Sequence, residues 1–460
     1  MLTIGKKIHF VGIGGAGMSA IAKVLIEKGY DVSGSDLKQS EVTERLRKLG
    51  ADIQIGQKEE NVKGKDVIVV STAIQAENPE MVAAKKWNIP ILHRSAVVAF
   101  LMNESPRGIA VAGAHGKTTT TSMSAVVLER CGLDPTVIIG GDVDYLGGNA
   151  KLGHSGVMVA EADESDGSFL TLYPKMAIVT NIENDHMDHY GTMDNILKAF
   201  RQFLHNLPEE DGVAILCYDN DHIREMAPQI ERRRITYAIE HEADYQAKNI
   251  ETLGQNTSFD VYYKGALCGQ IVLNVPGRHN VLNALGTIAA SREMGLTFDV
   301  IAEAFTLFNG AKRRFQTKAK EGGVWIVDDY AHHPTEINTT LTAARQTKPK
   351  RLVCVFQPHR YTRTHHLAKE FGAAFDEADV LILTDIYSAG EAPIDGVDGE
   401  LIVREVKAHN GRDAIYIKDW RQIADYLQQH YEEGDLIMTM GAGNIYEVGE
   451  DLAKRLAERA

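Results

Sequence analysis

A short run of glycine, lysine and threonine in the first third of the chain has the residue types of a phosphate-binding turn. It reads G-A-H-G-K-T-T-T-T over residues 113–121 and follows an apolar stretch at 109–112. Glycine lets the backbone approach an anion closely, N–H groups at a helix start attract negative charge, and Lys117 adds a point charge. The hydroxyl of Thr118 can hold Mg2+. The run therefore predicts a phosphate site.

The spacing of this turn is shorter than the general pattern. Only Ala114 and His115 separate Gly113 from Gly116, where the general pattern has four residues. The general pattern alone therefore does not assign the turn to a family. A plain strand-to-helix turn is the alternative, but such a helix needs one cap and not the four threonines that follow Lys117.

A second glycine turn, G-I-G-G-A-G, lies at residues 12–17. It follows an apolar stretch at 8–11 and precedes a helical pattern through 21–26, and Asp36 comes about 20 positions later. Strand, glycine turn, helix and acidic residue form the fingerprint of a dinucleotide site. Because the same geometry binds any pyrophosphate, the motif does not separate NAD from a nucleotide sugar.

Acidic loops follow two further apolar stretches. Glu161 ends the predicted strand at 157–160, and His186 belongs to the polar run 181–190 that follows the predicted strand at 176–180. Isolated acidic loops are usually only solvated. Because parallel strands bring their carboxyl ends to one edge of a sheet, however, these two loops are expected beside the phosphate turn. Carboxylates there suit Mg2+.

Arginine and histidine gather after predicted strands in the last third of the chain. Arginine forks bind carboxylates and phosphates through paired hydrogen bonds, so these loops predict the wall of an anion site. The candidate residues are Arg314, Asp329, Tyr330, His332, His359, Arg360 and Arg363.

The apolar stretches that position these loops alternate with helical patterns along the whole chain. At 460 residues the chain is too long for one core. We predict three α/β domains: a Rossmann-like domain at 1–104, a P-loop ATPase-like domain at 105–310, and a Rossmann-like domain at 311–460. Alternating apolar residues near 235–275 predict a small antiparallel addition to the central domain.

Composition narrows the kinds of partner. The formal net charge of -14 argues against nucleic acid or an acidic membrane as a partner. The four cysteines are scattered, which favours neither a zinc cluster nor a disulfide framework, and we expect them to be buried as small apolar residues. No apolar run approaches the length of a membrane helix. We therefore expect a cytoplasmic protein without membrane insertion, as a monomer or weak homodimer.

The motifs resemble those of the Mur ligases, in order and over nearly the whole length. The strings that carry the resemblance are G-I-G-G-A-G-M-S at 12–19, G-A-H-G-K-T-T-T-T at 113–121, E-A-D-E-S-D at 161–166, T-N-I-E-N-D-H-M-D-H-Y at 180–190, G-R-H-N-V-L-N-A at 277–284, R-R-F at 313–315, D-D-Y-A-H-H-P-T-E at 328–336 and H-R-Y-T-R-T at 359–364. The shortened phosphate turn is the form that this family uses.

The resemblance implies an ATP-dependent ligase. It would join L-alanine to the lactyl carboxylate of UDP-N-acetylmuramic acid through an acyl phosphate, releasing ADP and phosphate, in peptidoglycan precursor synthesis. The three domains would bind UDP-sugar, ATP and amino acid in that order. Two Mg2+ ions are expected, with Mn2+ as a possible substitute.

The resemblance also implies roles for particular residues. The catalytic set would be Lys117, Glu161, His186, Arg314 and Asp329. ATP would be bound by Gly113, Ala114, His115, Gly116, Lys117, Thr118, Thr119, Asn280, Asn283, Arg314 and Asp329, and metal by Thr118, Glu161 and His186. The UDP-sugar would be bound by Gly12, Gly14, Gly15, Ala16, Gly17, Asp36, Ser71, Thr72 and Arg94. The amino-acid side would consist of Tyr330, His332, His359, Arg360 and Arg363.

Three alternatives stay open. A recycling Mur ligase that adds a preformed peptide shares the nucleotide motifs. A nicotinamide-dependent dehydrogenase would use the first glycine turn but leaves Lys117, Glu161 and His186 without a role. A nucleotide switch would turn ATP over regardless of amino acid. Several relatives use a carbamoylated lysine, but the corresponding helix here offers only Lys198 and Arg201, so no such modification is assumed.

Overall fold

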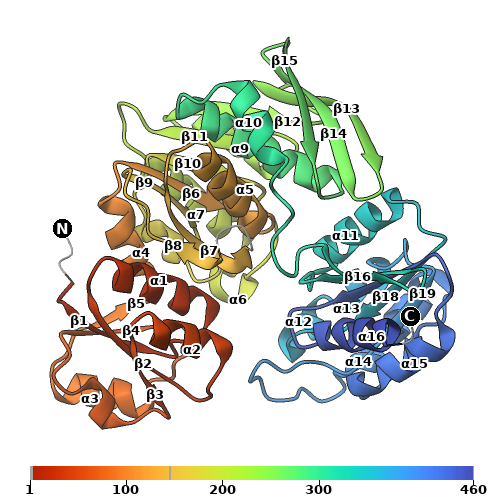
Figure 1. Cartoon of the computed structure of the whole chain (residues 1–460), viewed down its shortest axis with the longest axis horizontal. Helices are drawn as coiled ribbons and strands as arrows, with labels where there is room; N and C mark the ends of the chain where they lie inside the picture. The colour runs from red at the N-terminus through yellow and green to blue at the C-terminus, as the bar shows by residue number, and fades with distance from the viewer. Residues whose placement is uncertain (1–3, 144–146, 459–460) are drawn as a thin grey trace. The chain divides into compact units, whose positions relative to one another are not determined.

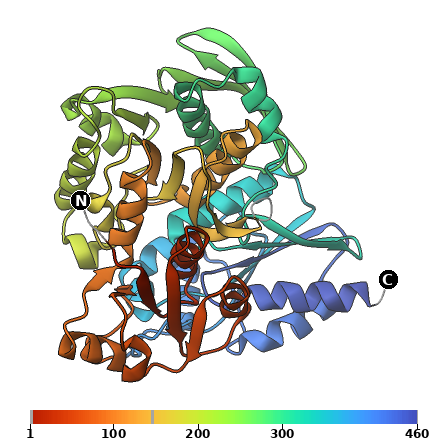
Figure 2. The same cartoon turned by 60° about the vertical axis from the view of Figure 1, so that its left-hand side comes forward.

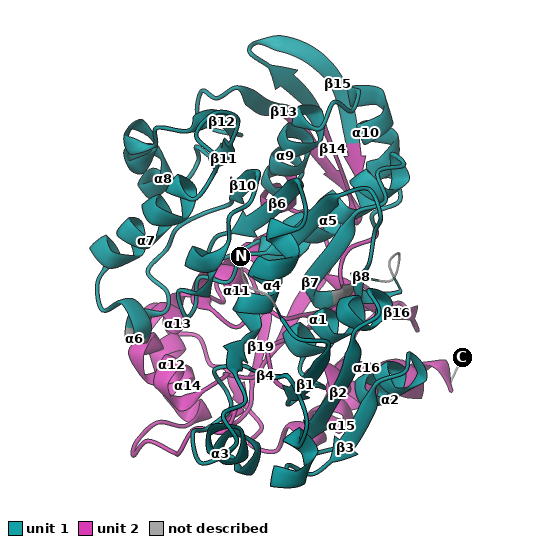
Figure 3. Ribbon diagram, turned by 90° about the vertical axis from the view of Figure 1, so that its left-hand side faces the viewer, with its two compact units in different colours: residues 1–248, 260–271, 282–308 teal, residues 249–259, 272–281, 309–460 magenta. Residues whose placement is uncertain are grey.

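The α/β architecture expected from the sequence is confirmed, with three separate sheets (Figure 1). The computed structural model describes residues 4–143 and 147–458. The chain divides into two compact units (Figure 3). One unit comprises residues 1–248, 260–271 and 282–308, and the other comprises 249–259, 272–281 and 309–460. The domain boundaries after residues 104 and 310 remain predictions.

The first sheet has five parallel strands in the order β3-β2-β1-β4-β5. Strand β4 reads VIVV and is wholly buried, and β1 is buried from its second residue onward, as in parallel sheets that are covered on both faces. The strands are β1 (Lys7–Val11), β2 (Asp31–Asp36), β3 (Asp52–Ile55), β4 (Val67–Val70) and β5 (Ile91–His93), and the helices are α1 (Ala16–Glu27), α2 (Glu41–Lys48), α3 (Pro79–Lys86) and α4 (Arg94–Asn103).

A buried polar network joins this sheet to helix α3. Glu80, which is fully buried, accepts hydrogen bonds from Ser35 Oγ and Asn61 Nδ2, both at 2.6 Å. His9 Nε2 lies 3.5 Å from the same carboxylate. Burial alone would raise the pKa of Glu80, but the hydrogen bonds from His9, Ser35 and Asn61 lower it overall. The Ser35 carbonyl accepts the N–H groups of residues 12 and 13, so the network supports the first glycine turn.

Glu80→Gln should lower the free energy of unfolding by about 1–3 kcal/mol at pH 7. The folded-state pKa lies below the unfolded value, so this stabilisation is present above about pH 4.5 and is lost as the pH falls through the folded pKa. Urea titrations at several pH values should therefore show the wild-type and variant curves converging in acid. Glu59→Gln removes an exposed carboxylate paired with Lys86 and is the matched control. A pH-independent difference would contradict this account.

The central sheet has ten strands in the order β15-β14-β13-β12-β11-β10-β6-β9-β7-β8. In the run β12-β11-β10-β6-β9-β7, each strand is parallel to the next one. Strand β8 is antiparallel to β7. Strands β13, β14 and β15 follow one another through two-residue turns, which only an antiparallel return allows. The strands are β6 (Arg107–Ala112), β7 (Thr136–Val143), β8 (Gly148–Lys151), β9 (Val157–Glu161), β10 (Met176–Val179), β11 (Val213–Cys217), β12 (Arg233–Ala238), β13 (Tyr245–Leu253), β14 (Asn256–Tyr263) and β15 (Ala266–Leu273). The antiparallel addition is thus as expected.

The helices around the central sheet include the two that carry candidate nucleotide ligands. Ser124 Oγ on α5 and Thr287 Oγ1 on α9 lie 3.2 Å apart, which fixes these two helices against each other. The helices are α5 (Lys117–Arg130), α6 (Met187–Tyr190), α7 (Met193–His205), α8 (Asp221–Met226), α9 (Arg278–Glu293) and α10 (Phe298–Phe305).

The third sheet has six strands in the order β16-β17-β21-β18-β19-β20. Residues along β18 alternate between two cores: Cys354 and Phe356 pack against α11, α13 and α14, and Val353 and Val355 pack against α15 and α16 (blue in Figure 2). The sheet is therefore covered on both faces. The elements are β16 (Gln316–Glu321), β17 (Val324–Asp329), β18 (Arg351–Phe356), β19 (Val380–Leu383), β20 (Ile415–Tyr416), β21 (Asp435–Met440), α11 (Pro334–Gln346), α12 (Tyr361–His366), α13 (Ala368–Ala373), α14 (Gly399–Asn410), α15 (Ile423–His430) and α16 (Tyr446–Ala457).

Two properties inferred from composition can be compared with the structure. Cys217 and Cys354 are buried, as expected for small apolar residues, but Cys131 and Cys268 are partly exposed, which corrects that expectation. Within residues 4–143 and 147–458, every helix is too short or too polar to cross a bilayer.

Candidate active site

The predicted phosphate turn joins the central strand β6 to helix α5. Gly113 and Gly116 have φ values of +135° and +82°, which favour glycine. A Cβ at Gly113 would lie 2.2 Å from Thr180 Oγ1, and one at Gly116 would lie 2.6 Å from Asn283 Oδ1. Both glycines are therefore required by close packing as well as by backbone conformation. The turn places the first N–H groups of α5 where an anion can accept them.

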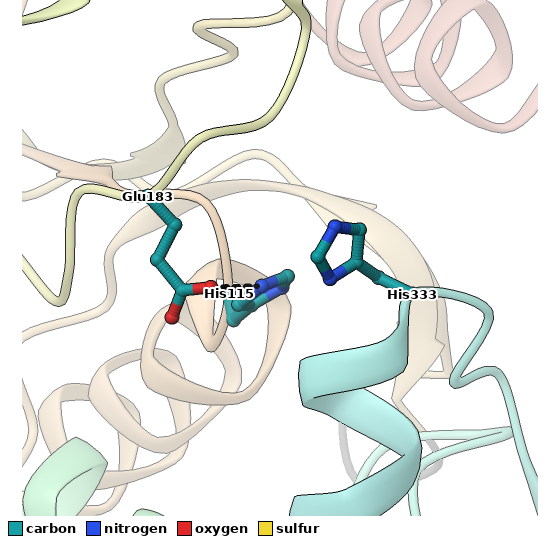
Figure 4. Close-up of side chains that lie close together, drawn as sticks. All are labelled: His115, Glu183 and His333. Atoms are coloured by element: carbon teal, nitrogen blue, oxygen red, sulfur yellow. Dashed lines mark hydrogen bonds and ion pairs between the residues drawn. The ribbon is translucent and has the colours of Figure 1, made fainter. Parts of the chain in front are cut away.

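The loop after β10 holds this turn in place. Asn181 Oδ1 accepts the His115 N–H at 2.8 Å, and Asn181 Nδ2 donates to the His115 carbonyl at 3.0 Å. Thr180 Oγ1 donates to the same carbonyl at 2.5 Å. The His115 ring lies 3.2 Å from Glu183 (Figure 4, which also draws His333 at the start of α11). The acidic loop thus supports the turn, a role that its sequence did not reveal.

Lys117 is anchored to its own turn and to a buried glutamate. Its Nζ donates to the carbonyls of Gly113 and Ala114 at 2.6 and 3.2 Å and to Glu164 Oε1 at 2.8 Å. Burial alone would lower the pKa of Lys117, but Glu164 and Asp163 raise it overall. Burial raises the pKa of Glu164. The lysine is therefore a fixed positive charge at the phosphate turn.

Thr118 and Glu161 each lie against one of two adjacent glycines of strand β7. A Cβ at Gly140 would lie 3.0 Å from a Glu161 carboxylate oxygen, and one at Gly141 would lie 3.4 Å from the Thr118 methyl group. Glu161 Oε1 accepts the Gly140 N–H at 2.7 Å. A hydroxyl and a carboxylate beside a phosphate turn form the oxygen donor set that Mg2+ prefers. The residues therefore fit the expected ion.

His186 lies in the same unit, at the start of the short helix α6. Its φ of +57° is uncommon for a residue other than glycine. The ring Nε2 lies 3.4 Å from Asp185 Oδ2 and 3.7 Å from Glu164 Oε1. The shared carboxylate of Glu164 thus links His186 to Lys117.

The first glycine turn is bonded to its own acidic residue. The Gly14 N–H donates to Asp36 Oδ2 at 2.9 Å. Gly15 precedes α1 as its N-cap, and the Ala16 carbonyl accepts Asn149 Nδ2 at 2.7 Å. Ser71 and Thr72 follow β4 directly, at the carboxyl edge of the same sheet.

Arg94 connects this turn to the acidic loop after β9. A Cβ at Gly17 would lie 2.5 Å from the Arg94 guanidinium, whose NH2 also donates to Asp163 Oδ2 at 2.5 Å. Burial would raise the pKa of Asp163, but Lys117 and Arg94 lower it to about 2. The glycine turn at 12–17 and the phosphate turn at 113–121 are therefore linked through the charges of Arg94, Asp163 and Lys117.

The two adjacent arginines of the second unit differ in their surroundings. Arg313 lies between the rings of Tyr330 and Tyr446, 5.0 and 4.6 Å from their centroids, and pairs with Asp328 at 3.0 Å. Arg314 lies 5.3 Å from the Tyr330 ring. Arg313 is thus fixed by packing, which leaves Arg314 as the arginine better able to reach a ligand.

Asp329 ties the arginine loop to the third sheet. Its carboxylate accepts the N–H groups of Phe315 and Ala331 at 2.7 and 2.8 Å. Burial raises its pKa to about 6, although Arg314 and the two backbone donors oppose that shift. The carboxylate therefore fixes the backbone directly after Arg314 and directly after β17.

The remaining candidates of this unit form a cluster. The rings of His332 and His359 lie 5.9 Å apart, His359 stacks on Tyr387, and Arg363 lies 3.3 Å from His359 Nδ1. Burial lowers the pKa of His332 to about 4 and of His359 to about 3. Both imidazoles are therefore neutral at physiological pH. Arg360 has a φ of +71° and is half exposed.

Helix α9 carries the two candidate asparagines on its first turns. Asn280 and Asn283 are each 5% exposed and, three residues apart, share one face of the helix. Asn280 Nδ2 donates to the Pro276 carbonyl at 2.7 Å.

Comparison with known families decides the assignment. Three family models match successive parts of the chain: "Mur ligase family, catalytic domain" at 7–106, "Mur ligase middle domain" at 111–291 and "Mur ligase, glutamate ligase domain" at 313–443. The chain belongs to the Mur ligase family. It is an ATP-dependent amide-bond-forming ligase, as the resemblance implied.

Individual relatives cover nearly all of this Mur ligase. The UDP-N-acetylmuramate--L-alanine ligase of Pelotomaculum thermopropionicum is 52% identical, over 98% of each chain. The UDP-N-acetylmuramate-alanine ligase structure from Thermotoga maritima is 30% identical and has a TM-score of 0.85, covering 99% of this chain and 100% of that one. A murein peptide ligase from Psychrobacter arcticus is 24% identical with a TM-score of 0.74, covering 98% and 99%, and shares the fold.

The structure of this Mur ligase gathers the candidate residues in each unit separately. In one unit, Lys117 and Thr118 begin α5 at the phosphate turn, Glu161 binds the Gly140 N–H, and His186 is linked to Lys117 through Glu164. The arginine and histidine cluster belongs to the other unit. The sequence did not identify Glu164, Asn181 or Tyr387, although Glu164 stood within the acidic run 161–166.

Proposed function

We propose that this Mur ligase joins L-alanine to the lactyl carboxylate of UDP-N-acetylmuramic acid and converts ATP to ADP and phosphate. The observation that carries the proposal is the phosphate turn, where Lys117 is anchored beside Thr118 and Glu161. The choice of alanine is supported by the name of the relative that is 52% identical.

The reaction begins with an anion that approaches another anion. A carboxylate oxygen of the sugar attacks the γ-phosphorus of ATP, and the bond from that phosphorus to the β-γ bridging oxygen breaks, which gives an acyl phosphate and ADP. Lys117 and the N-terminus of α5 supply positive charge to the phosphates, and the family resemblance implies the same role for Arg314. Thr118 and Glu161 would hold one Mg2+ and His186 a second, with Mn2+ as a substitute. These ions supply charge neutralisation.

The second step forms the amide. The neutral amine of alanine attacks the acyl carbon, and the tetrahedral intermediate collapses as its bond to the phosphate oxygen breaks, so that phosphate leaves with one former carboxylate oxygen. Arg360 and Arg363 would bind carboxylate, with Tyr330, His332 and His359 beside them. Asn280 and Asn283 would contact adenine, as the family resemblance implies. Asp329 would complete the nucleotide site through Arg314.

The first sheet would bind the sugar nucleotide. The pyrophosphate would occupy the turn at 12–17, at the start of α1, with Asp36, Ser71, Thr72 and Arg94 beside it. We place the enzyme in the cytoplasm as a monomer or weak homodimer, with domains at 1–104, 105–310 and 311–460 and no nucleic-acid partner.

Arg363→Ala should raise the Michaelis constant for the amino acid or the sugar acid at least about tenfold, because a bidentate charge-assisted pair is lost. Steady-state kinetics with each substrate varied in turn measures this. Arg404→Ala is the matched control, since Arg404 is an exposed arginine of α14 near Asp398 and Glu400. Unchanged Michaelis constants for both substrates would exclude Arg363 from carboxylate binding.

Phosphate release tests the proposed reaction. We expect release only when UDP-N-acetylmuramic acid, ATP, Mg2+ and alanine are all present, and a panel of amino acids and a preformed tripeptide identifies the acceptor. Turnover of ATP without an amino acid would favour a nucleotide switch. A preference for the tripeptide would favour a recycling ligase.

A further inference from the structure

Glu164 is a buried carboxylate beside Lys117 to which the proposed reaction gives no role. Its side chain is 4% exposed, and its Oε1 lies 2.8 Å from Lys117 Nζ. Its position is fixed through the backbone, because the Glu164 carbonyl accepts the Tyr190 hydroxyl at 2.5 Å and the Gly167 N–H at 3.0 Å. The loop thus presents this carboxylate to the lysine.

The Lys117 ammonium has its hydrogen-bonding capacity filled. An ammonium has three N–H donors, and three acceptors surround this one: the carbonyls of Gly113 and Ala114 and the carboxylate of Glu164. To donate to a phosphate, Lys117 has to give up one acceptor. The two carbonyls belong to the turn itself, whereas Glu164 comes from another loop and is an anion that a phosphate can replace.

The Lys117–Glu164 ion pair is not the most stable arrangement of these two side chains. Glu164 Oε2 is buried and has no hydrogen-bond partner among residues 4–143 and 147–458. An unsatisfied buried carboxylate oxygen is costly. A carboxylate held in this way has a single ammonium partner at hydrogen-bond distance, and His186 Nε2 lies farther away, 3.7 Å from Oε1.

We propose that Glu164 is a positioning residue. Before nucleotide binds, it is the counter-ion that holds Lys117 at the turn, and a nucleotide phosphate then replaces it as an acceptor of the Lys117 ammonium. This inference rests on the proposed function. The same negative charge opposes an incoming anion, so Glu164 weakens the binding of a nucleotide that arrives without a metal ion.

Titration calorimetry with ADP in the presence of a chelator tests the proposal on the whole chain. Glu164→Gln keeps the shape of the side chain and removes its charge, so metal-free ADP should bind about fivefold or more tightly than to wild type. The turnover number for ligation should fall, because Lys117 and His186 lose their common partner. Glu164→Ala should show the same gain in ADP affinity. Glu129→Gln, at the far end of α5 and paired with Lys151, should leave it unchanged.

The outcomes separate this inference from the proposed function. If wild type binds ADP but Glu164→Gln and Glu164→Ala bind it equally or more weakly, Glu164 is a purely structural partner and the proposal is overturned. If wild type does not bind ADP even when Mg2+ is supplied, the proposed function fails first and this inference fails with it.

Discussion

Lys117→Met is expected to reduce ligation by about 10³-fold or more, because the charge fixed at the phosphate turn is lost. The structure adds a second effect. Removing the lysine leaves the carboxylate of Glu164 buried without its partner, which should lower the free energy of unfolding by about 3–5 kcal/mol. Phosphate-release assays and urea titrations measure the two effects separately.

The double variant Lys117→Met/Glu164→Gln separates the loss of stability caused by the unpaired Glu164 carboxylate from the loss of activity caused by the missing lysine. It removes both members of the pair, so stability should recover most of the way to wild type while activity stays lost. A single Lys117→Met variant with wild-type stability would show that the two side chains are not coupled in the folded protein.

Asp329→Ala is expected to lower both stability and turnover. The backbone N–H groups of Phe315 and Ala331 would lose their acceptor, at a cost of about 2–5 kcal/mol for the two buried donors. The loop that carries Arg314 would also be released, and misplacing a positioning group by about 1 Å costs on the order of 10²-fold in rate. Thermal unfolding and steady-state kinetics on the same preparation measure both.

Asp379→Ala provides the matched control for this variant. Asp379 accepts the Leu352 N–H at 2.7 Å and pairs with Arg345, so its loss should also cost stability. It carries no candidate ligand, and turnover should therefore stay near the wild-type value. Equal losses of turnover in both variants would mean that Asp329 acts only through overall stability.

Elements with a strong local signal could be predicted from the sequence. Four consecutive Val and Ile residues at 67–70 favour a buried parallel strand, and β4 lies at these residues. The phosphate turn was also evident, since its glycines, lysine and threonines are contiguous. Strand β16, with the sequence QTKAKE, was not predicted, because it has no apolar alternation and depends on pairing with β17.

Contacts between distant residues could not be predicted in the same way. Arg313 and Arg314 are identical in type, and the first is distinguished by its packing against Tyr330 and Tyr446 and by its ion pair with Asp328. Arg94 and Asp163 are 69 residues apart, and nothing in either local sequence indicates that they pair. Glu164 looks like one member of a solvated acidic run until burial places it against Lys117.

The central claim is that ATP activates the sugar carboxylate as an acyl phosphate. UDP-N-acetylmuramic acid labelled with 18O in its lactyl carboxylate tests this directly, with mass spectrometry of the phosphate released during ligation to alanine. We predict one 18O atom in each phosphate, because the carboxylate oxygen that attacks phosphorus leaves with it. Ligation with no 18O in the phosphate would contradict the account.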